Sequence, residues 1–245
     1  MYTKNCILER NPDRIKTRKQ KMSEITNYKC VIFDMDGTIL DTTDDITKSV
    51  NLTLEEFGYP GHSAKEVVSY LNNGAVKLIE RALPVSERNI ENVLKVHKRY
   101  LEIYSEHVCE KTHAYEGIPD LFRKMKSVGI KLAVVSNKPY IQTKILTDKC
   151  FSKGTFDYVS GSGEGFPTKP DKACIDRALE VLKVDKKDVL YVGDSYVDVL
   201  TAKKSGITCA GVLWGFAGEN SFTEHKPDYM VKDANQLEKL VFPED

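Results

Sequence analysis

The sequence predicts an α/β fold: a doubly wound parallel sheet with a helical domain inserted after the first strand. Two observations lead to this expectation. Short apolar runs alternate with helical stretches of about ten residues, which is typical of a parallel sheet whose two faces are covered by helices. About a hundred residues between the first two strong apolar runs are almost entirely helical, which is too long for one crossover connection.

The composition limits the kind of protein this is. The 245 residues, 41% of them hydrophobic, are enough for a large buried core. Lysine plus arginine and aspartate plus glutamate both total 36, and this zero net charge disfavours a general nucleic-acid binder. No apolar run approaches the roughly 20 residues of a membrane span, so we expect no membrane partner. Six scattered cysteines without CxxC spacing favour a reducing cytoplasm, and the five histidines lack zinc-site spacing.

Residues 1–27 differ in composition from the rest of the chain. They carry seven lysine or arginine residues against three acidic ones, and they lack the apolar segment of a secretory signal. We interpret them as a disordered extension, with a targeting or nucleic-acid-binding arm as the alternative. Met22 is a second plausible start, which would leave residues 1–21 outside the native protein.

The first predicted strand, Cys30–Phe33, is followed by the long helical interval. We assign residues 43–114 to a helical cap domain, and residues 28–42 and 115–245 to the α/β core. Within the cap, apolar residues recur at helical spacing, with breaks at 58–61, 72–74 and Pro84, and the longest helix is predicted over 86–108. A cap at this place would close over the sheet edge where open α/β sheets bind ligands.

Beyond the cap, predicted strands and helices alternate. Strands are expected at 131–135, 188–192 and 208–213, with weaker candidates at 156–159 and 228–231. Helices are expected at 118–128, 140–150, 172–182 and 197–205. Gly129 and Gly206 directly follow the first and last of these helices, as glycine commonly does at a helix C-terminus.

Four short polar segments lie at the junctions between predicted strands and helices. They are residues 34–38 (DMDGT), 136–139 (SNKP), 169–171 (KPD) and 193–198 (GDSYVD). Each alone has an ordinary structural interpretation, such as a polar turn, a helix cap or a solvated lysine. Their joint occurrence at such junctions would be a large coincidence, so together they indicate one functional site.

With these four segments the sequence resembles the haloacid dehalogenase superfamily, in its phosphatase branch with a helical cap. The resemblance covers residues 28–240 and implies a Rossmann-like core. Within the superfamily the chain is most similar to the phosphoglycolate phosphatase group, in the segments DMDGTILDT, NNGAVKLIERAL, VVSNKP, TKPD, GDSYVDVLTAKKSG and GVLWGF. The resemblance implies a Mg²⁺-dependent phosphatase that acts on a small phosphorylated metabolite.

The resemblance also implies the catalytic and metal-binding roles. Asp34 would be the nucleophile and would form an aspartyl-phosphate. Asp36 would protonate the leaving alcohol and then act as the base for the hydrolytic water. Asp194, an oxygen of Asp34 and the backbone carbonyl of Asp36 would hold Mg²⁺, a hard ion that prefers oxygen ligands. The ion would also weaken the repulsion between Asp34 and the incoming phosphate.

Further residues would bind the phosphate or support the site. Those expected on the non-bridging oxygens are Ser136, the Asn137 amide and Lys169. Asp198 would orient Lys169 or a metal-bound water, and Thr38 would form a hydrogen bond with Asp34.

Several alternatives stay open at this point. Phosphoglycolate is the leading substrate, but a nucleotide, a sugar phosphate or pyrophosphate fits the same motifs. A sugar-phosphate mutase of the same fold retains both acids and is the nearest enzymatic alternative, whereas Asp36 disfavours the dehalogenase and phosphonatase branches. A third alternative is a non-catalytic protein that senses a phosphorylated ligand. The sequence carries no signal for the oligomeric state.

Overall fold

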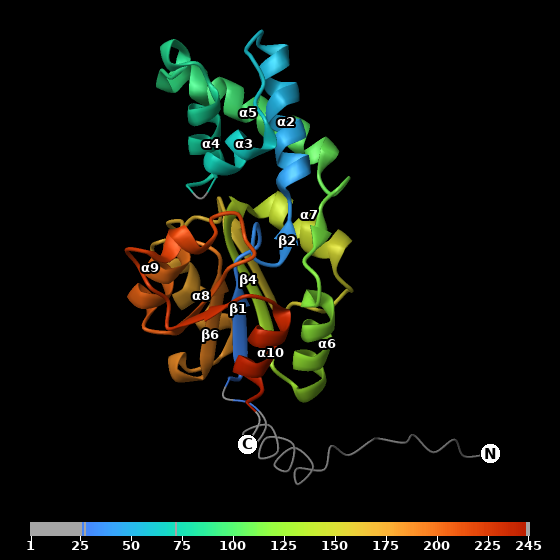
Figure 1. Cartoon of the computed structure of the whole chain (residues 1–245), viewed down its shortest axis with the longest axis vertical. Helices are drawn as coiled ribbons and strands as arrows, with labels where there is room; N and C mark the ends of the chain where they lie inside the picture. The colour runs from blue at the N-terminus through green and yellow to red at the C-terminus, as the bar shows by residue number, and fades with distance from the viewer. Residues whose placement is uncertain (1–25, 27, 72, 244–245) are drawn as a thin grey trace, which may run out of the picture.

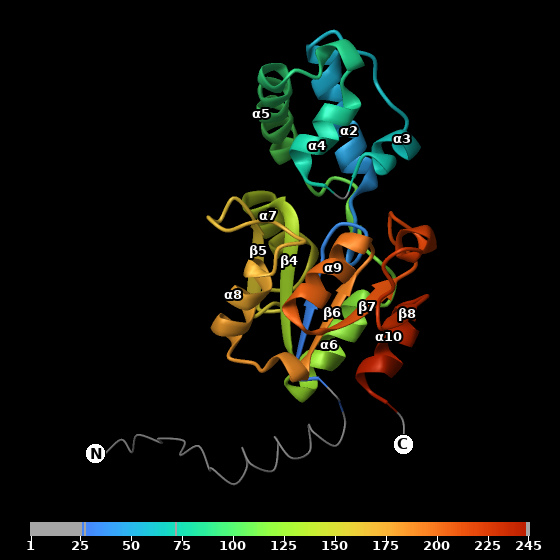
Figure 2. The ribbon, with the colours of Figure 1, turned by 90° about the vertical axis from the view of Figure 1, so that its left-hand side faces the viewer.

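The computed structural model describes residue 26, residues 28–71 and residues 73–243. Most of the predicted extension and the second start at Met22 lie outside the described residues. Six parallel strands form the central sheet, in the order β5-β4-β1-β6-β7-β8 (Figure 2). Their bounds are β1 Cys30–Phe33, β4 Lys131–Pro139, β5 Tyr158–Ser162, β6 Val189–Gly193, β7 Thr208–Val212 and β8 Tyr229–Val231. The predicted α/β fold class is confirmed.

Strand β1 occupies the middle of the sheet because it is apolar on both faces. Cys30 pairs in register with Lys131 of β4 on one side and with Val189 of β6 on the other. The chain fills the sheet from β1 outwards through β4 and β5, and then crosses to the opposite side for β6, β7 and β8. The carboxyl ends of β1, β4 and β6 therefore meet at the point where the strand order reverses, which is where such sheets bind ligands.

Helices cover both faces of the sheet, as the two-residue alternation of β1 requires. Val31 and Phe33 pack in the core beneath α6 (Ile118–Val128), α7 (Tyr140–Cys150) and α10 (Ala234–Val241). Cys30 and Ile32 face the core beneath α8 (Ala173–Leu182) and α9 (Tyr196–Ser205). The glycines predicted to end α6 and α9 do so in the left-handed conformation.

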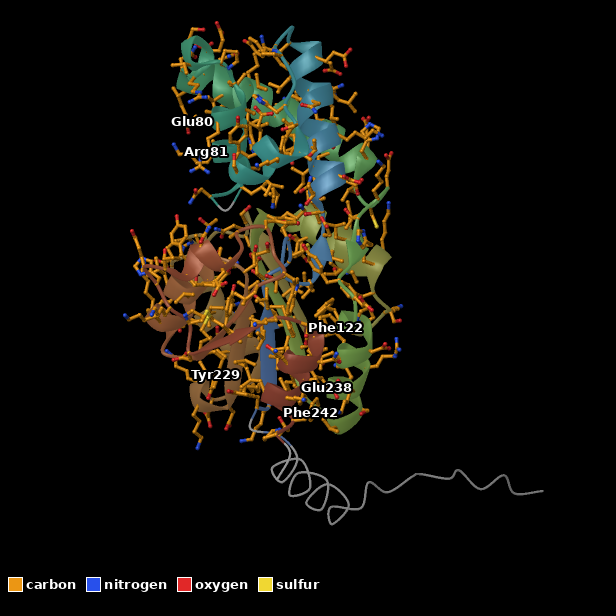
Figure 3. The ribbon with its side chains drawn as sticks, in the orientation of Figure 1. Glu80, Arg81, Phe122, Tyr229, Glu238 and Phe242 are labelled. Carbon is orange, nitrogen blue, oxygen red and sulfur yellow. The ribbon has the colours of Figure 1, made fainter. Side chains whose placement is uncertain are left out.

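The C-terminal helix closes the sheet on the side of α6. Figure 3 shows Glu238 and Phe242, at the end of the chain, facing α6, the helix that carries Phe122. Lys124 of α6 forms an ion pair with Glu238, and its ammonium lies 4.7 Å from the centre of the Phe242 ring. This contact fastens α10 over the face that holds Phe33 and Phe122, whose ring centres are 4.9 Å apart.

A group of helices, called the helical insertion below, lies beyond the carboxyl ends of the strands (Figure 1). It comprises α2 (Thr43–Glu56), α3 (Ala64–Ser69), α4 (Ala75–Ala82), the 3₁₀ turn η1 (Val85–Glu87) and α5 (Ile90–His107). Two short antiparallel strands, β2 (Leu40–Asp41) and β3 (His113–Ala114), lead into and out of it. The division of the chain into a cap at 43–114 and a core on either side stays a prediction.

Asp45 ties the two connections of the insertion together. It is buried on α2, and its carboxylate accepts hydrogen bonds from the backbone amides of Lys111 and Thr112, both at 2.9 Å, and from the Thr112 hydroxyl. The segment that returns to the core is thereby fastened to the segment that leaves it.

Most element bounds agree with the predictions within two or three residues, and the differences have local causes. The helix predicted over 86–108 begins at Ile90, because the Asn89 side chain caps it by accepting from the Asn92 amide. Strand β4 runs on to Pro139, with a register shift against β5 after Val135. The five cysteines in the described part of the chain are free thiols. Among the described helices, none has the length and apolar character to cross a bilayer.

Candidate active site

The four polar segments of the sequence come together at the carboxyl edge of β1, β4 and β6. A cavity of about 80 Å³ lies there, between this edge and the helical insertion. Its polar wall comes from the core and includes Asp34, Asp36, Ser136, Asn137, Lys138, Lys169 and Ser195. Its apolar wall is mainly from the insertion and includes Ile46, Leu71, Ala75, Leu78, Tyr100, Leu101 and Tyr104.

Lys169 stands at the centre of a buried network of charges. Its ammonium lies 2.9 Å from Oδ1 of Asp34, and it donates hydrogen bonds to Oδ1 of Asp198 at 2.7 Å and to the hydroxyl of Tyr191 at 3.0 Å. Burial on its own would lower the pKa of Lys169, but the carboxylates of Asp198 and Asp34 outweigh it and raise that pKa. The lysine is therefore held as a fixed positive charge beside Asp34.

Asp34 follows β1 directly, and its backbone amide donates to the Val192 carbonyl of β6 at 2.9 Å. Burial, the largest cause, raises the pKa of Asp34 to about 6, and the neighbouring carboxylates of Asp198 and Asp36 act in the same direction. Lys169 opposes this shift. At neutral pH the Asp34 carboxylate is therefore ionised, and Lys169 offsets only part of its negative charge. A carboxylate that acts as a nucleophile would have to be in this state.

Asp194 gives the clearest indication that this site can hold a cation. One of its oxygens, Oδ2, accepts from the Ala217 amide at 3.2 Å, while Oδ1 is buried and has no partner among the residues that the structure describes. Burial chiefly, and then the charges of Asp198 and Asp34, raise the pKa of Asp194 well above its ordinary value. Carboxylate oxygens of Asp34, Asp194 and Asp198 lie within 4.8 Å of one another. A hard cation such as Mg²⁺ fits this donor set, because it would satisfy the unpaired oxygen and offset the excess negative charge.

Asp198 differs from the other two carboxylates because both of its oxygens are already engaged. Oδ1 accepts from Lys169 and from Tyr191, and Oδ2 accepts from the amide and the hydroxyl of Ser195. Asp34 and Asp194 thus offer the oxygens that a metal ion could use, whereas Asp198 holds Lys169 in place.

Two glycine loops press against Asp194 and fix its carboxylate. Gly37 has a φ of +80°, and a Cβ there would come within 2.4 Å of Oδ2 of Asp194. A Cβ at Gly215 would come within 2.3 Å of Cβ of Asp194. Only residues without a side chain allow both loops to approach this closely.

Asp36 faces the cavity and is paired with Lys138, a residue to which the sequence analysis assigned no role. Lys138 donates to both oxygens of Asp36 at 3.1 Å, and the Thr42 hydroxyl donates to Oδ1 at 2.8 Å. The Lys138 ammonium also lies 4.5 Å from the centre of the Tyr104 ring of α5. Its place within the SNKP segment was the available signal, but its partners come from segments far away in the sequence.

Ser136 and Asn137 lie where expected at the cavity, and Asn137 has a second task. Its side chain donates to the Lys169 carbonyl at 3.0 Å and accepts from the Lys169 amide at 2.8 Å, which clamps the loop that carries this lysine. The hydrogen bond expected between Thr38 and Asp34 is not formed, and the buried Thr38 hydroxyl has no partner within the described part of the chain. The amide of Thr38 instead donates to the Met35 carbonyl within the turn.

Comparisons with known proteins agree with the fold. Residues 31–212 match the family model described as haloacid dehalogenase-like hydrolase. Phosphoglycolate phosphatase 1 of Pseudomonas aeruginosa is 30% identical over 233 residues, which cover 89% of this chain and 84% of that protein. Phosphoglycolate phosphatase of Aquifex aeolicus is 32% identical over 217 residues, which cover 87% and 96%.

Two crystal structures are similar along most of their length. A protein of Lactobacillus delbrueckii subsp. bulgaricus superposes with a TM-score of 0.82 at 30% identity, covering 89% of this chain and all of that one. A predicted phosphoglycolate phosphatase from Haemophilus somnus superposes with a TM-score of 0.79 at 26% identity, covering 86% and 97%.

Proposed function

The chain belongs to the haloacid dehalogenase-like hydrolase family, and we propose that it is a Mg²⁺-dependent phosphomonoesterase that works through an aspartyl-phosphate. Its substrate is a small phosphorylated metabolite. 2-Phosphoglycolate is the leading candidate, because the relatives that match nearly the whole chain carry that substrate in their names.

The observation that carries this proposal is the arrangement around Asp34. An ionised carboxylate lies 2.9 Å from a buried lysine and beside Asp194, whose Oδ1 has no partner in the described residues. Asp34 attacks the phosphorus atom, and the Lys169 ammonium and the Ser136 hydroxyl stabilise the negative charge of the phosphoryl oxygens. Because Asn137 and Asp198 hold Lys169 from opposite ends, its ammonium is in place before the substrate binds.

Asp36 acts as the general acid in the first half-reaction and as the general base in the second. It faces the same cavity as Asp34, so it can donate a proton to the leaving alcohol oxygen and later take one from the attacking water. Oxygens of Asp34 and Asp194 and the backbone carbonyl of Asp36 would hold Mg²⁺. When bound, the ion would offset the charge of these carboxylates and so permit a phosphate dianion to approach.

The apolar wall of the cavity favours hydrolysis of a compact ester over a hexose phosphate mutase. This wall includes the aliphatic side chains of Ile46, Leu71 and Leu78. A hexose phosphate would bring several hydroxyl groups against such side chains, which offer them no hydrogen-bond partner, whereas 2-phosphoglycolate places only two carbon atoms beyond the ester oxygen. A ligand sensor would not require both Asp34 and Asp36 to face one cavity.

The test is phosphate release from a panel that includes 2-phosphoglycolate and β-glucose 1-phosphate, measured with Mg²⁺ and with EDTA. We expect Mg²⁺-dependent release with one preferred small substrate. Silence of the folded protein across the panel would contradict the proposal and favour a sensor. Slow phosphate release together with rapid isomerisation of the sugar phosphate would favour a mutase.

A further inference from the structure

We propose that Lys138 determines substrate specificity by binding a carboxylate on the leaving group. The preferred substrates are then phosphate esters whose carboxylate is attached to the carbon that bears the ester oxygen. The inference rests on the proposed phosphatase function and assigns the recognition of the leaving group to one residue of the same site.

Lys138 places a positive charge at the boundary between the core and the helical insertion. Its side chain is only 5% exposed. It lies between the Asp36 carboxylate on the core side and the Tyr104 ring on the insertion side. The other basic side chain on the described wall of the cavity is Lys169, which is committed to Asp34 and Asp198. The two ammonium groups therefore serve different ends of a bound ester.

The hydrogen bonds of Lys138 leave room for another anion. An ammonium group has three donors, and the acceptors of this one within the described residues are the two oxygens of Asp36. On its other side it meets the face of the Tyr104 ring, which attracts a cation but does not replace an oxygen acceptor. A carboxylate oxygen arriving from the cavity would complete the coordination of the ammonium.

The position of Asp36 fixes where that carboxylate must be. As the proton donor, Asp36 must lie about 2.6–3.2 Å from the leaving oxygen, and the same carboxyl group lies 3.1 Å from the Lys138 ammonium. The ester oxygen and the ammonium thus share one neighbour. An anionic group one carbon beyond the ester oxygen falls within reach of Lys138, whereas one at the end of a longer chain would overshoot it.

The rest of the wall strengthens this preference. The insertion contributes aliphatic and tyrosine side chains to the described wall of the cavity, such as Ile46, Leu78 and Tyr100, and no charged side chain. A carboxylate would meet no positive charge on that side, and in such surroundings an interaction between opposite charges is stronger than in water. The recognition of charge therefore depends on Lys138.

The experiment compares two esters of similar size, 2-phosphoglycolate and ethyl phosphate, in the wild-type protein and in Lys138→Met, Lys138→Gln and Lys138→Arg. The wild type should prefer 2-phosphoglycolate. Lys138→Met and Lys138→Gln should lose roughly 10–100-fold more kcat/KM on 2-phosphoglycolate than on ethyl phosphate, as expected for a lost charge-assisted hydrogen bond. Most of this difference should appear in KM. Lys138→Arg, which retains the charge, should recover part of the preference.

The ratio between the two esters separates specificity from support of Asp36. Loss of the Lys138–Asp36 pair would slow both substrates by the same factor, so equal losses in the glutamine and methionine variants would overturn the proposal. Lys138→Gln keeps the test usable if Lys138→Met fails to fold. A wild type that prefers phosphate esters with an uncharged leaving group would overturn this inference but leave the phosphatase function standing. A wild type that releases phosphate from no ester would overturn both.

Discussion

Replacing Asp198 with asparagine tests whether this buried carboxylate holds Lys169 in place. Asp198 is fully buried and accepts hydrogen bonds from Lys169, from Tyr191 and, twice, from Ser195. Asparagine has the same shape, but one of its terminal atoms is an amide nitrogen, which cannot accept. Donors that face this nitrogen in the variant lose their acceptor. Of the two carboxylates that pair with Lys169 in the wild type, Asp34 and Asp198, only Asp34 remains.

The expected loss of stability follows from these contacts. Removing one partner of a buried ion pair costs about 3–5 kcal/mol, and a buried donor left unsatisfied costs about 1–3 kcal/mol. The two effects overlap at Asp198, and Lys169 retains Asp34, so we expect a loss of about 3 kcal/mol in the free energy of unfolding. For a chain of this size that lowers Tm by about 6–12 °C.

The same variant should change the pH dependence of the reaction in a defined direction. The charge of Asp198 is one of the causes that raise the pKa of Asp34 to about 6. Without that charge, the pKa of Asp34 falls, so the carboxylate stays ionised to lower pH. The acidic limb of the kcat/KM profile should therefore move to lower pH, even though kcat/KM itself falls by about 10–100-fold because Lys169 is no longer held.

The assay combines thermal unfolding with phosphate release at saturating Mg²⁺ across the acidic range. Asp148→Asn is the matched control, because Asp148 is an exposed residue of α7 that pairs with Lys144. It should change stability by less than about 1 kcal/mol and leave the pH profile in place. The reasoning is refuted if Asp198→Asn behaves like this control, or if its acidic limb moves to higher pH.

Three further predictions concern the nucleophile, the metal and the loop beside them. Asp34→Asn should abolish Mg²⁺-dependent phosphate release while the far-UV circular dichroism spectrum is unchanged; appreciable turnover, with deamidation excluded, would contradict the nucleophile assignment. Mg²⁺ should raise Tm more at pH 7.5 than at pH 5, because protons compete for Asp34 and Asp194, whose pKa values are raised. An increment independent of pH would show that the ion binds elsewhere. Gly37→Ala should raise the Mg²⁺ concentration required for half-maximal activity at least tenfold, because its Cβ would meet Asp194. Gly58→Ala is the control, because Gly58 has a similar φ and open space around it, and this variant should only lower stability by about 1 kcal/mol.

The local pattern of the sequence was sufficient to predict most elements of the core. Strand β1 is a contiguous apolar run, and α6 and α9 end at glycines that adopt the left-handed conformation. Such signals lie within a few residues of the element that they define, so no knowledge of the fold is needed to recognise them. The same holds for the four junction segments, because their polar residues directly follow a strand or precede a helix in the sequence.

The pairings within the site were beyond the reach of the sequence. Lys138 is adjacent to Asn137 in the chain, but its partner Asp36 lies 102 residues away and its aromatic neighbour Tyr104 belongs to the insertion. The expected bond between Thr38 and Asp34 is not formed: the Thr38 amide donates to the Met35 carbonyl, and its buried hydroxyl has no partner among the described residues. Contacts of this kind depend on how separate elements pack against one another.

The sequence by itself determined the order of the elements and the chemistry available at each strand end, including the carboxylates of Asp34 and Asp194 and the ammonium of Lys169. The tertiary structure alone decided which charges pair and which stay unpaired. It buries Lys169 between Asp34 and Asp198, leaves an oxygen of Asp194 without a partner among the described residues, and sets Lys138 against Asp36. The physical reason is burial: removal of water makes each charge depend on the neighbours that the fold supplies, and those neighbours come from distant parts of the chain.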